Sequence, residues 1–206
     1  MNKLVFGVGV NDLDYRTRVY EYVTENGGRK VLKPVFRCKY YAAWERMLER
    51  CYSKKYLESK PSYNGTIVCS EWLSATAFKK WMEKQDWEGK CLDKDIIVPK
   101  SKLYSPETCA FVLNATNTFV IACDASRGEY HIGVCLYKRT GKYKASCGNP
   151  FTGKQEHLGY YSTPEDAHEA WRKRKHDLAQ FVADTESDMR VVEALRKRYS
   201  LEEWYK

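Results

Sequence analysis

Residues 130–161 read YHIGVCLYKRTGKYKASCGNPFTGKQEHLGYY. Three short runs in this stretch alternate between apolar and polar side chains, which is typical of strands buried on one side. Turn-forming residues separate the runs, at 138–141 and again at 148–153. The stretch therefore predicts a three-stranded antiparallel sheet with one apolar face.

A helix is expected directly after the third run. Thr163 is a suitable N-cap, Pro164 suits the first helical turn, and Asp166 completes a capping-box arrangement. The cationic run 172–175 is interpreted as a solvated helix face. We expect the side chains that recur at helical spacing to pack on the sheet. These are Ala167, Ala170, Trp171, Arg174, Leu178 and Phe181.

The other face of the predicted sheet is basic. Residues 130–155 contain five cationic side chains and no carboxylate, and a surface of this kind suits a polyanion. Alternation places Cys135 on this face and Glu156 on the apolar side, where we expect it at the sheet edge. The predicted DNA-binding residues are Tyr137, Lys138, Arg139, Lys142, Lys144, Ser146, Gln155 and His157.

The markers of this region resemble a known domain. Its glycines, aromatic residues and helix start follow the order found in the APETALA/ethylene-response-factor type of DNA-binding domain. These markers are Gly133-Val134, 141–143, Ala145, 158–160, Thr163, Glu165 and Ala167. That domain also occurs in phage and mobile-element proteins. The resemblance implies that residues 130–183 lay a three-stranded sheet in the major groove of double-stranded DNA.

The chain departs from the plant members of that family. Ile132, Cys135 and Tyr137 stand where the plant domains place arginines, and His157 replaces a tryptophan. Arginine is the usual bidentate reader of guanine, so the base preference of the plant domains does not carry over. The lysines are expected to hold phosphates, which position a protein without specifying sequence.

Residues 35–122 show a second pattern. Apolar residues from Tyr41 to Tyr52 follow helical spacing, and Ala77, Phe78, Trp81 and Met82 predict a second helix that starts near Ser74 or Thr76. We expect strands at 67–69 and 92–98, and a turn at 104–108 that leads into a helix. The opening run 4–10 is interpreted as a strand.

This segment resembles phage-encoded relatives of HNH homing endonucleases. The similarity lies in WERMLERCYS (44–53), YNGTIVCSEW (63–72), LDKDI (92–96) and YSPETCAFV (104–112). It implies a ββα-related module of the type that uses a histidine base and a divalent ion to cleave DNA. All four histidines of this chain lie beyond residue 130, so the module is a degenerate, histidine-free relative.

Two carboxylates keep an enzyme hypothesis open. Asp93 and Asp95 would share one face of the predicted strand and together hold Mg²⁺, with Glu107 or Asn117 as a further ligand. In the alternative interpretation, one acid pairs with a nearby lysine and the other caps a turn. No Ser-His-Asp order and no nucleotide-binding glycine loop is present.

Composition limits the remaining classes. The chain has 206 residues and a net charge of +8, and it contains neither an apolar run of membrane length nor a signal peptide. We therefore expect a cytoplasmic protein that does not contact a membrane. The eight cysteines show no CxxC spacing, so reduced, packed thiols are favoured over a metal or disulfide site.

The sequence thus predicts an α+β protein with four parts. They are an N-terminal extension (1–34), the HNH-like module (35–122), the DNA-binding domain (130–183) after a linker at 120–130, and a C-terminal helix (188–206) that packs on the core or mediates self-association. The expected function is duplex DNA binding, with no cofactor required for it. The alternatives are a Mg²⁺-dependent homing or nicking endonuclease and a protein that binds a host factor.

Overall fold

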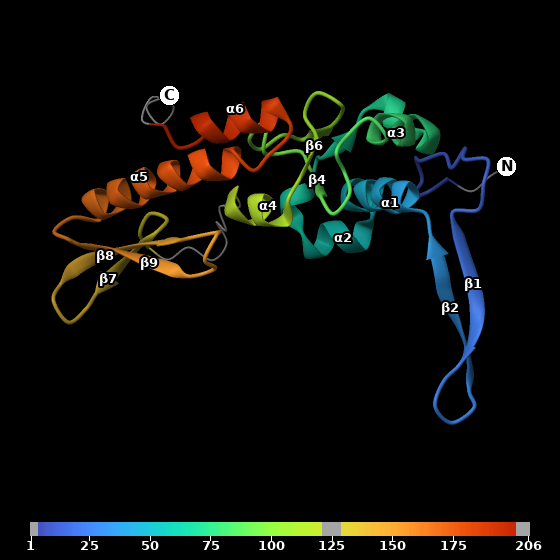
Figure 1. Cartoon of the computed structure of the whole chain (residues 1–206), viewed down its shortest axis with the longest axis horizontal. Helices are drawn as coiled ribbons and strands as arrows, with labels where there is room; N and C mark the ends of the chain where they lie inside the picture. The colour runs from blue at the N-terminus through green and yellow to red at the C-terminus, as the bar shows by residue number, and fades with distance from the viewer. Residues whose placement is uncertain (1–3, 121–128, 201–206) are drawn as a thin grey trace. The chain divides into compact units, whose positions relative to one another are not determined.

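The computed structural model describes residues 4–120 and 129–200, and it has mixed α+β architecture (Figure 1). The chain forms two compact units. The first contains residues 1–88 and 98–111, and the second contains residues 89–97 and 112–206. The expected linker at 120–130 and the end of the expected C-terminal helix lie largely outside the described residues.

The first unit is built around aromatic side chains. The amphipathic pattern between Tyr41 and Tyr52 forms a helix as predicted, and Trp44 on this helix is fully buried. The indole Nε1 of Trp44 donates to the carbonyl of Trp72 at 2.7 Å, so the polar atom of the ring is satisfied inside the core. The elements of this unit are β1 (Arg18–Thr24), β2 (Lys30–Arg37), α1 (Lys39–Tyr52), α2 (Lys54–Ser59), β3 (Ile67–Val68), α3 (Ala75–Met82) and β5 (Leu103–Tyr104), with short 3₁₀ helices at Pro61–Tyr63 and Ser70–Leu73.

Strands β1 and β2 form an antiparallel hairpin. Its register runs from Arg18 opposite Arg37 to Thr24 opposite Lys30, with a bulge next to Val19. Most residues of both strands are exposed, and none is buried. This hairpin lies mostly in the segment predicted as an N-terminal extension, where no strand was expected beyond the run 4–10.

The second unit contains the predicted three-stranded antiparallel sheet packed on a helix. The strands are β7 (Val134–Tyr137), β8 (Lys142–Gly148) and β9 (Gln155–Tyr161), in the order β7-β8-β9. Helix α5 (Pro164–Ala183) lies along one face of the sheet (Figure 1). As predicted, the side chain of Thr163 accepts a hydrogen bond from the Asp166 N–H and caps the helix.

Gly133 allows the helix to approach the start of β7. Its φ is +82°, and a Cβ at this position would lie 2.1 Å from Cδ1 of Trp171. Glycine is therefore required both by the backbone conformation and by the space that the indole occupies.

The helix face that covers the sheet differs from the prediction in two ways. Phe181 is 58% exposed, and the neighbouring Val182 is buried instead. The run 172–175, expected to be solvated, is mostly engaged, because Arg172 is only 6% exposed and Arg174 and Lys175 have partners described below. A local charge run does not reveal partners that lie far away in the sequence.

Helix α6 (Met189–Lys197) packs on α5 within the second unit. The side chain of Asp188 caps its N-terminus, and Val191 and Leu195 are fully buried. Met189, the first residue of the helix, is 65% exposed. The helix therefore closes its own unit, which was one of the two roles predicted for it.

Three predicted elements are wrong. The run 4–10 forms a tight loop with isolated bridges, in which Val5 pairs with Gly9, because its glycines turn the chain back at once. The strand expected at 92–98 is only β4 (Cys91–Asp93), followed by a turn. The helix expected after residue 108 is instead the buried strand β6 (Ala110–Val112), followed by α4 (Asn114–Val120).

Two further findings concern composition. The seven cysteines that the structure describes are free thiols, and Cys135 is exposed. Within the described residues, no helix is both long and apolar enough to cross a membrane.

Candidate nucleic-acid interface

The register of the sheet assigns each side chain to a face. Val134 lies opposite Ala145, which is fully buried, so this pair faces α5. Their neighbours in sequence therefore point to the outer face of the sheet. The outer face contains Cys135, Tyr137, Lys142, Lys144, Ser146, Gln155, His157 and Tyr160.

Six of the eight predicted DNA-binding residues are strand residues on this outer face. Tyr137 comes from β7; Lys142, Lys144 and Ser146 come from β8; Gln155 and His157 come from β9. The remaining two, Lys138 and Arg139, lie in the turn between β7 and β8, where both are exposed. The outer strand face and the turn thus bring together the residues that alternation selected.

Tyr160 was missed by sequence reasoning. A bulge follows Ala145, so that Ala145 pairs with Gly159 while Ser146 pairs with His157. The extra residue in β9 shifts the alternation and brings Tyr160 onto the outer face, where its ring lies 5.1 Å from that of Tyr137 and 4.8 Å from that of His157. Gly159, with φ of +136°, is the sequence signal that could have indicated the irregularity.

The carboxylate of Glu156 is turned away from the outer face. Arg174 of α5 donates to it from Nε and Nη2 at 2.6 and 3.0 Å, and Asn149 donates at 2.6 Å. The hydrogen bonds from Arg174 and then from Asn149 lower the pKa of Glu156 to about 2. This contact explains why a carboxylate stands on the side of β9 that was predicted to be apolar.

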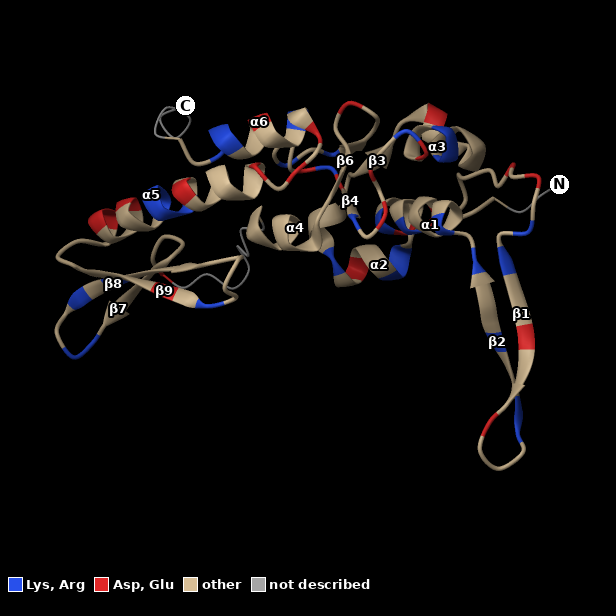
Figure 2. Cartoon of the chain, viewed as in Figure 1, with Lys and Arg blue, Asp and Glu red and all other residues tan. Residues whose placement is uncertain are grey.

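The cations of the outer face remain available to a ligand. Among the described residues, no carboxylate lies within ion-pair distance of Lys138, Lys142 or Lys144, or of Arg139 and Lys154. The guanidinium of Arg139 stacks over the Tyr137 ring at 5.5 Å. Figure 2 shows cationic residues at the ends of these strands and in the turn that joins β7 to β8.

Behind the sheet, Lys175 is held in an unusual setting. Its Nζ donates to the carbonyl of Phe119 at 2.7 Å and lies 3.5 Å from the centre of the Phe119 ring. Burial, with a smaller contribution from Arg198, lowers the pKa of Lys175 to about 8. This lysine serves the packing of the second unit and does not belong to the outer face.

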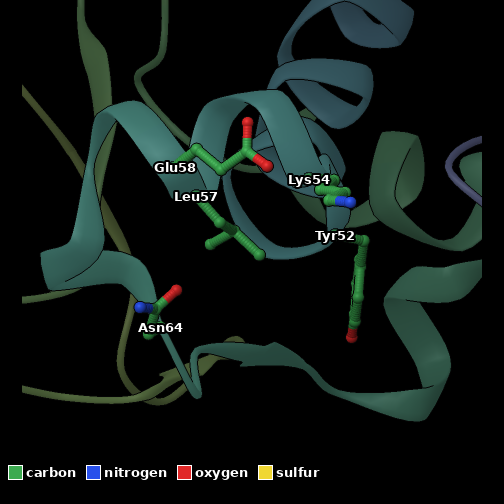
Figure 3. Close-up of a pocket in the computed structure, with 5 residues that line it drawn as sticks. All are labelled: Tyr52, Lys54, Leu57, Glu58 and Asn64. Carbon is green, nitrogen blue, oxygen red and sulfur yellow. The ribbon is translucent and has the colours of Figure 1, made fainter.

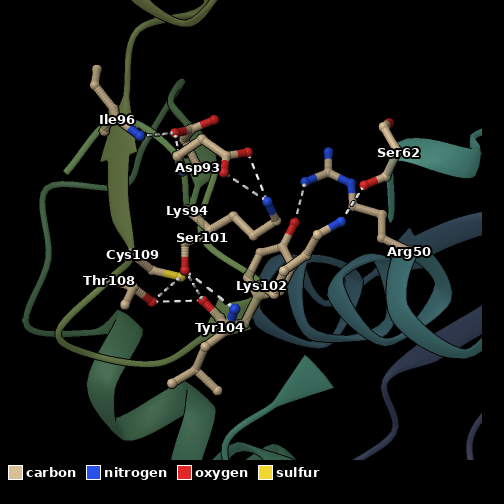
Figure 4. A network of polar contacts seen from close by, with 12 residues as sticks. Arg50, Ser62, Asp93, Lys94, Ile96, Ser101, Lys102, Tyr104, Thr108 and Cys109 are labelled. Atoms are coloured by element: carbon tan, nitrogen blue, oxygen red, sulfur yellow. Dashed lines mark hydrogen bonds and ion pairs between the residues drawn. The ribbon is translucent and has the colours of Figure 1, made fainter. Parts of the chain in front are cut away.

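The predicted Mg²⁺ site has a different geometry from the one expected. Oδ1 of Asp93 accepts the backbone N–H groups of Asp95 and Ile96 at 2.9 and 2.8 Å and caps the turn after β4 (Figure 4). Asp95 lies beyond the strand and pairs with Lys94 at 2.7 Å. The expectation that both carboxylates share one strand face is therefore wrong, because the strand ends at Asp93.

Asp93 is thus engaged in the turn cap, and Asp95 is engaged in the ion pair with Lys94. Burial raises the pKa of Asp93. In the described part of the chain, no group of three His, Cys, Asp or Glu side chains is arranged to hold a metal ion. The arrangement at 93–95 matches the structural alternative, in which one acid pairs with a lysine and the other caps a turn.

A pocket in the first unit offers a second concave surface. It lies against α2 and is lined by Tyr52, Lys54, Leu57, Glu58 and Asn64 (Figure 3). The Tyr52 hydroxyl accepts the N–H of Val68 at 3.0 Å and therefore supports the fold. The pocket is open to solvent and carries no functional argument.

Compared with protein-family models, with curated proteins and with solved structures, the chain gives no match. The resemblances to the APETALA/ethylene-response-factor domain and to HNH endonucleases therefore stay predictions from the sequence.

Proposed function

We propose that the chain binds duplex DNA through the outer face of β7–β9. The observation that carries this proposal is the separation of charge across the sheet. Lys142 and Lys144 stand on the outer face without acidic neighbours, while Glu156, the carboxylate within these three strands, is turned inwards and paired with Arg174. A surface that is cationic and free of acids attracts a phosphate backbone.

The chemistry of the outer face supports contacts to both backbone and bases. Lysines neutralise phosphates, whereas Arg139, Gln155 and Ser146 have the donors and acceptors that read base edges. A sheet can enter the major groove, which is about 12 Å wide. The helix α5 covers the apolar side, so the outer face is left for the ligand.

A salt titration tests this proposal directly. Fluorescence anisotropy with a labelled duplex should show that log Kd rises linearly with log salt concentration, with a slope of about 4 if four cations each neutralise a phosphate. The binding should persist in EDTA, because no metal takes part in it. An affinity that hardly changes between low and moderate salt would contradict the proposal.

A matched pair of variants tests the face itself. Lys144→Ala removes a cation from the outer face, and Lys173→Ala removes an exposed cation from α5 behind the sheet. We expect Lys144→Ala to weaken binding to all sequences by about tenfold, because a phosphate contact is lost. Lys173→Ala should bind like the wild type, and equal losses in the two variants would indicate that only net charge matters.

Sequence preference separates the reading residues from the positioning ones. A selection from a random duplex library should return a less restricted site for Arg139→Ala at one position, whereas Lys144→Ala should keep the wild-type site with lower affinity. Uniform losses from both variants would refute this division.

We further propose that residues 35–122, which belong partly to each unit, are a histidine-free relative of the HNH module that adds phosphate or partner contacts without cleaving DNA. The commitment of Asp93 to a turn cap and of Asp95 to Lys94 supports the non-catalytic assignment. Incubation of the chain with supercoiled plasmid and Mg²⁺ or Mn²⁺ should leave the plasmid intact. Nicking that disappears in Asp95→Asn would establish the endonuclease hypothesis instead.

A further inference from the structure

The hairpin β1–β2 is a two-stranded ribbon, and no helix or strand among the described residues covers either of its faces. In β1 the residues from Tyr20 onward are exposed, and in β2 all residues except Val31 are exposed. Tyr22 is 73% exposed, the highest value among the large apolar side chains that the structure describes. An isolated two-stranded ribbon is marginally stable in water, so this surface indicates a binding partner.

The base of the hairpin is fixed to the first unit. Arg18 and Arg37, which lie opposite each other, both donate to the Glu45 carboxylate of α1. Because both arginines bind the same carboxylate, the two strands are held together where the hairpin leaves the core. The remainder of the ribbon is thereby presented to solvent in a defined orientation relative to α1.

The register separates the ribbon into two different faces. One face combines aromatic, apolar and cationic side chains, and none of its residues from Tyr20 to Pro34 is acidic. We call it the aromatic face. The opposite face contains Glu21 beside Lys33, which also pairs with Glu25 at 2.7 Å. The aromatic face consists of Tyr20, Tyr22, Thr24, Lys30, Leu32 and Pro34.

Charge indicates the kind of partner. Residues 16–37 contain six cationic and two acidic side chains, which gives the segment a net charge of +4. At the tip, Arg29 and Lys30 have no ion-pair partner among the described residues. A second copy of the ribbon would bring like charges together, whereas a nucleic acid would neutralise them.

The tip is shaped for close approach to a backbone. Gly27 and Gly28 have φ of +98° and +79°, and a Cβ on either would meet nothing within 4 Å. The turn is closed by hydrogen bonds from Gly28 N–H to the Glu25 carbonyl and from Glu25 N–H to the Arg29 carbonyl. A narrow tip with two glycines and two free cations can enter a groove that admits a two-stranded ribbon.

We propose that the β1–β2 hairpin is a second DNA contact, an arm whose aromatic face and tip lie in a groove of duplex DNA. The arm extends the function proposed for β7–β9 and rests on separate residues. Two contacts on one chain multiply their affinities when both are engaged, since the second binding event becomes intramolecular. The arm would therefore strengthen binding and lengthen the bound site.

Photo-crosslinking tests the arm in the full-length chain. A benzophenone amino acid at Tyr22 should crosslink to a labelled duplex, whereas the same group at Val23, on the opposite face, should give much less of this product. A product between two chains, or no crosslink to the duplex from Tyr22, would overturn the proposal.

A matched pair of double variants tests the tip. Arg29→Ala with Lys30→Ala removes both free cations, and Lys173→Ala with Lys197→Ala removes two exposed cations from α5 and α6. The tip variant should lose about tenfold or more in affinity, lower the slope of log Kd against log salt by about 2, and shorten the protected footprint. The proposal fails if the tip variant behaves like the control variant with Lys173 and Lys197 replaced.

The failure of the arm can be distinguished from the failure of the sheet. If Lys142→Ala with Lys144→Ala binds like the wild type while Tyr22 still crosslinks to DNA, the sheet proposal fails and the arm stands. If the sheet variant loses binding and the tip variant does not, the sheet stands and the arm fails.

Discussion

The chain contains two antiparallel β surfaces of opposite construction. The sheet β7–β9 has α5 packed on one face, and its central strand buries Ala145 and Cys147 completely or nearly so. In the part of the chain that the structure describes, no element covers the hairpin β1–β2, and both of its faces are exposed. Both surfaces carry cations and tyrosines, so the same side-chain chemistry is presented in two different ways.

The comparison shows what a covering helix provides. Ala145 and Cys147 of the central strand are buried on the side of α5, and the one inward carboxylate is paired with Arg174, so the outer face is left free for ligand contacts. The hairpin lacks this cover and gains its order from its own ladder and from Glu45 at its base. We therefore expect substitutions in the two regions to differ in their effect on stability.

The largest difference in the free energy of unfolding should be between alanine substitutions at Gly133 and Gly28, two glycines with similar φ. Gly133→Ala introduces a side chain at positive φ and against Trp171, and we expect it to lower the free energy of unfolding by about 3 kcal/mol. Gly28→Ala has a similar φ but open space, and we expect a cost of about 1 kcal/mol that affects the hairpin alone. Urea unfolding measures both, and similar losses would mean that Trp171 does not pack against the start of β7.

The second expected effect is a pH dependence of the free energy of unfolding, caused by Lys175 on the helix behind the sheet. Because its pKa is about 8 in the folded chain and near 10.5 when unfolded, the folded state releases the proton first as pH rises. The free energy of unfolding should therefore increase above pH 8, by roughly 2 kcal/mol by pH 9.5. The increase should be absent in Lys175→Met, and a gain that survives this substitution would exclude Lys175 as its source.

A smaller effect is expected at acidic pH from Glu156. Its pKa is lowered from 4.5 to about 2, so its pairing with Arg174 stabilises the fold above the unfolded value and is lost as pH falls from 4.5 towards 2. Wild type and Glu156→Gln should therefore differ in urea midpoint at pH 6 and converge near pH 2. A difference that stays constant with pH would assign the effect of the substitution to packing.

The smallest effect is expected in the hairpin. Tyr22→Ser replaces a highly exposed side chain, and the free energy of unfolding should change by less than about 0.5 kcal/mol. Hydrogen exchange should also show faster exchange of the amides of β1 and β2 than of β8. A large loss of stability in this variant would mean that the aromatic face is packed within the chain, which would remove the contrast with the sheet.

Much of the second unit could be predicted from the sequence. The alternation in 130–161, the turns and the Thr163 cap are local signals, and the structure contains the strands, turn and helix start that they indicate. The cationic outer face could be predicted for the same reason, because residues two apart on a strand share a face whatever the rest of the chain does.

Residues 4–112 were harder to predict, first because several of their strands are short. Strands of two or three residues, such as β3 and β4, carry too few residues to show a period, so the stretch after Asp93 resembled a strand. The hairpin β1–β2 was missed for a different reason. Its two faces are both exposed and therefore lack the apolar alternation that marks a strand buried on one side.

The sequence by itself determined where the strands of the sheet run, where α5 begins and which side chains share the outer face. Tertiary structure decided the partners of the charged residues: Glu156 is held by Arg174 across 18 positions, and Lys175 is held by Phe119 across 56. It also decided the bulge that brings Tyr160 to the outer face. Periodicity is a property of neighbouring residues, whereas ion pairs and strand register depend on segments that meet only when the chain has folded.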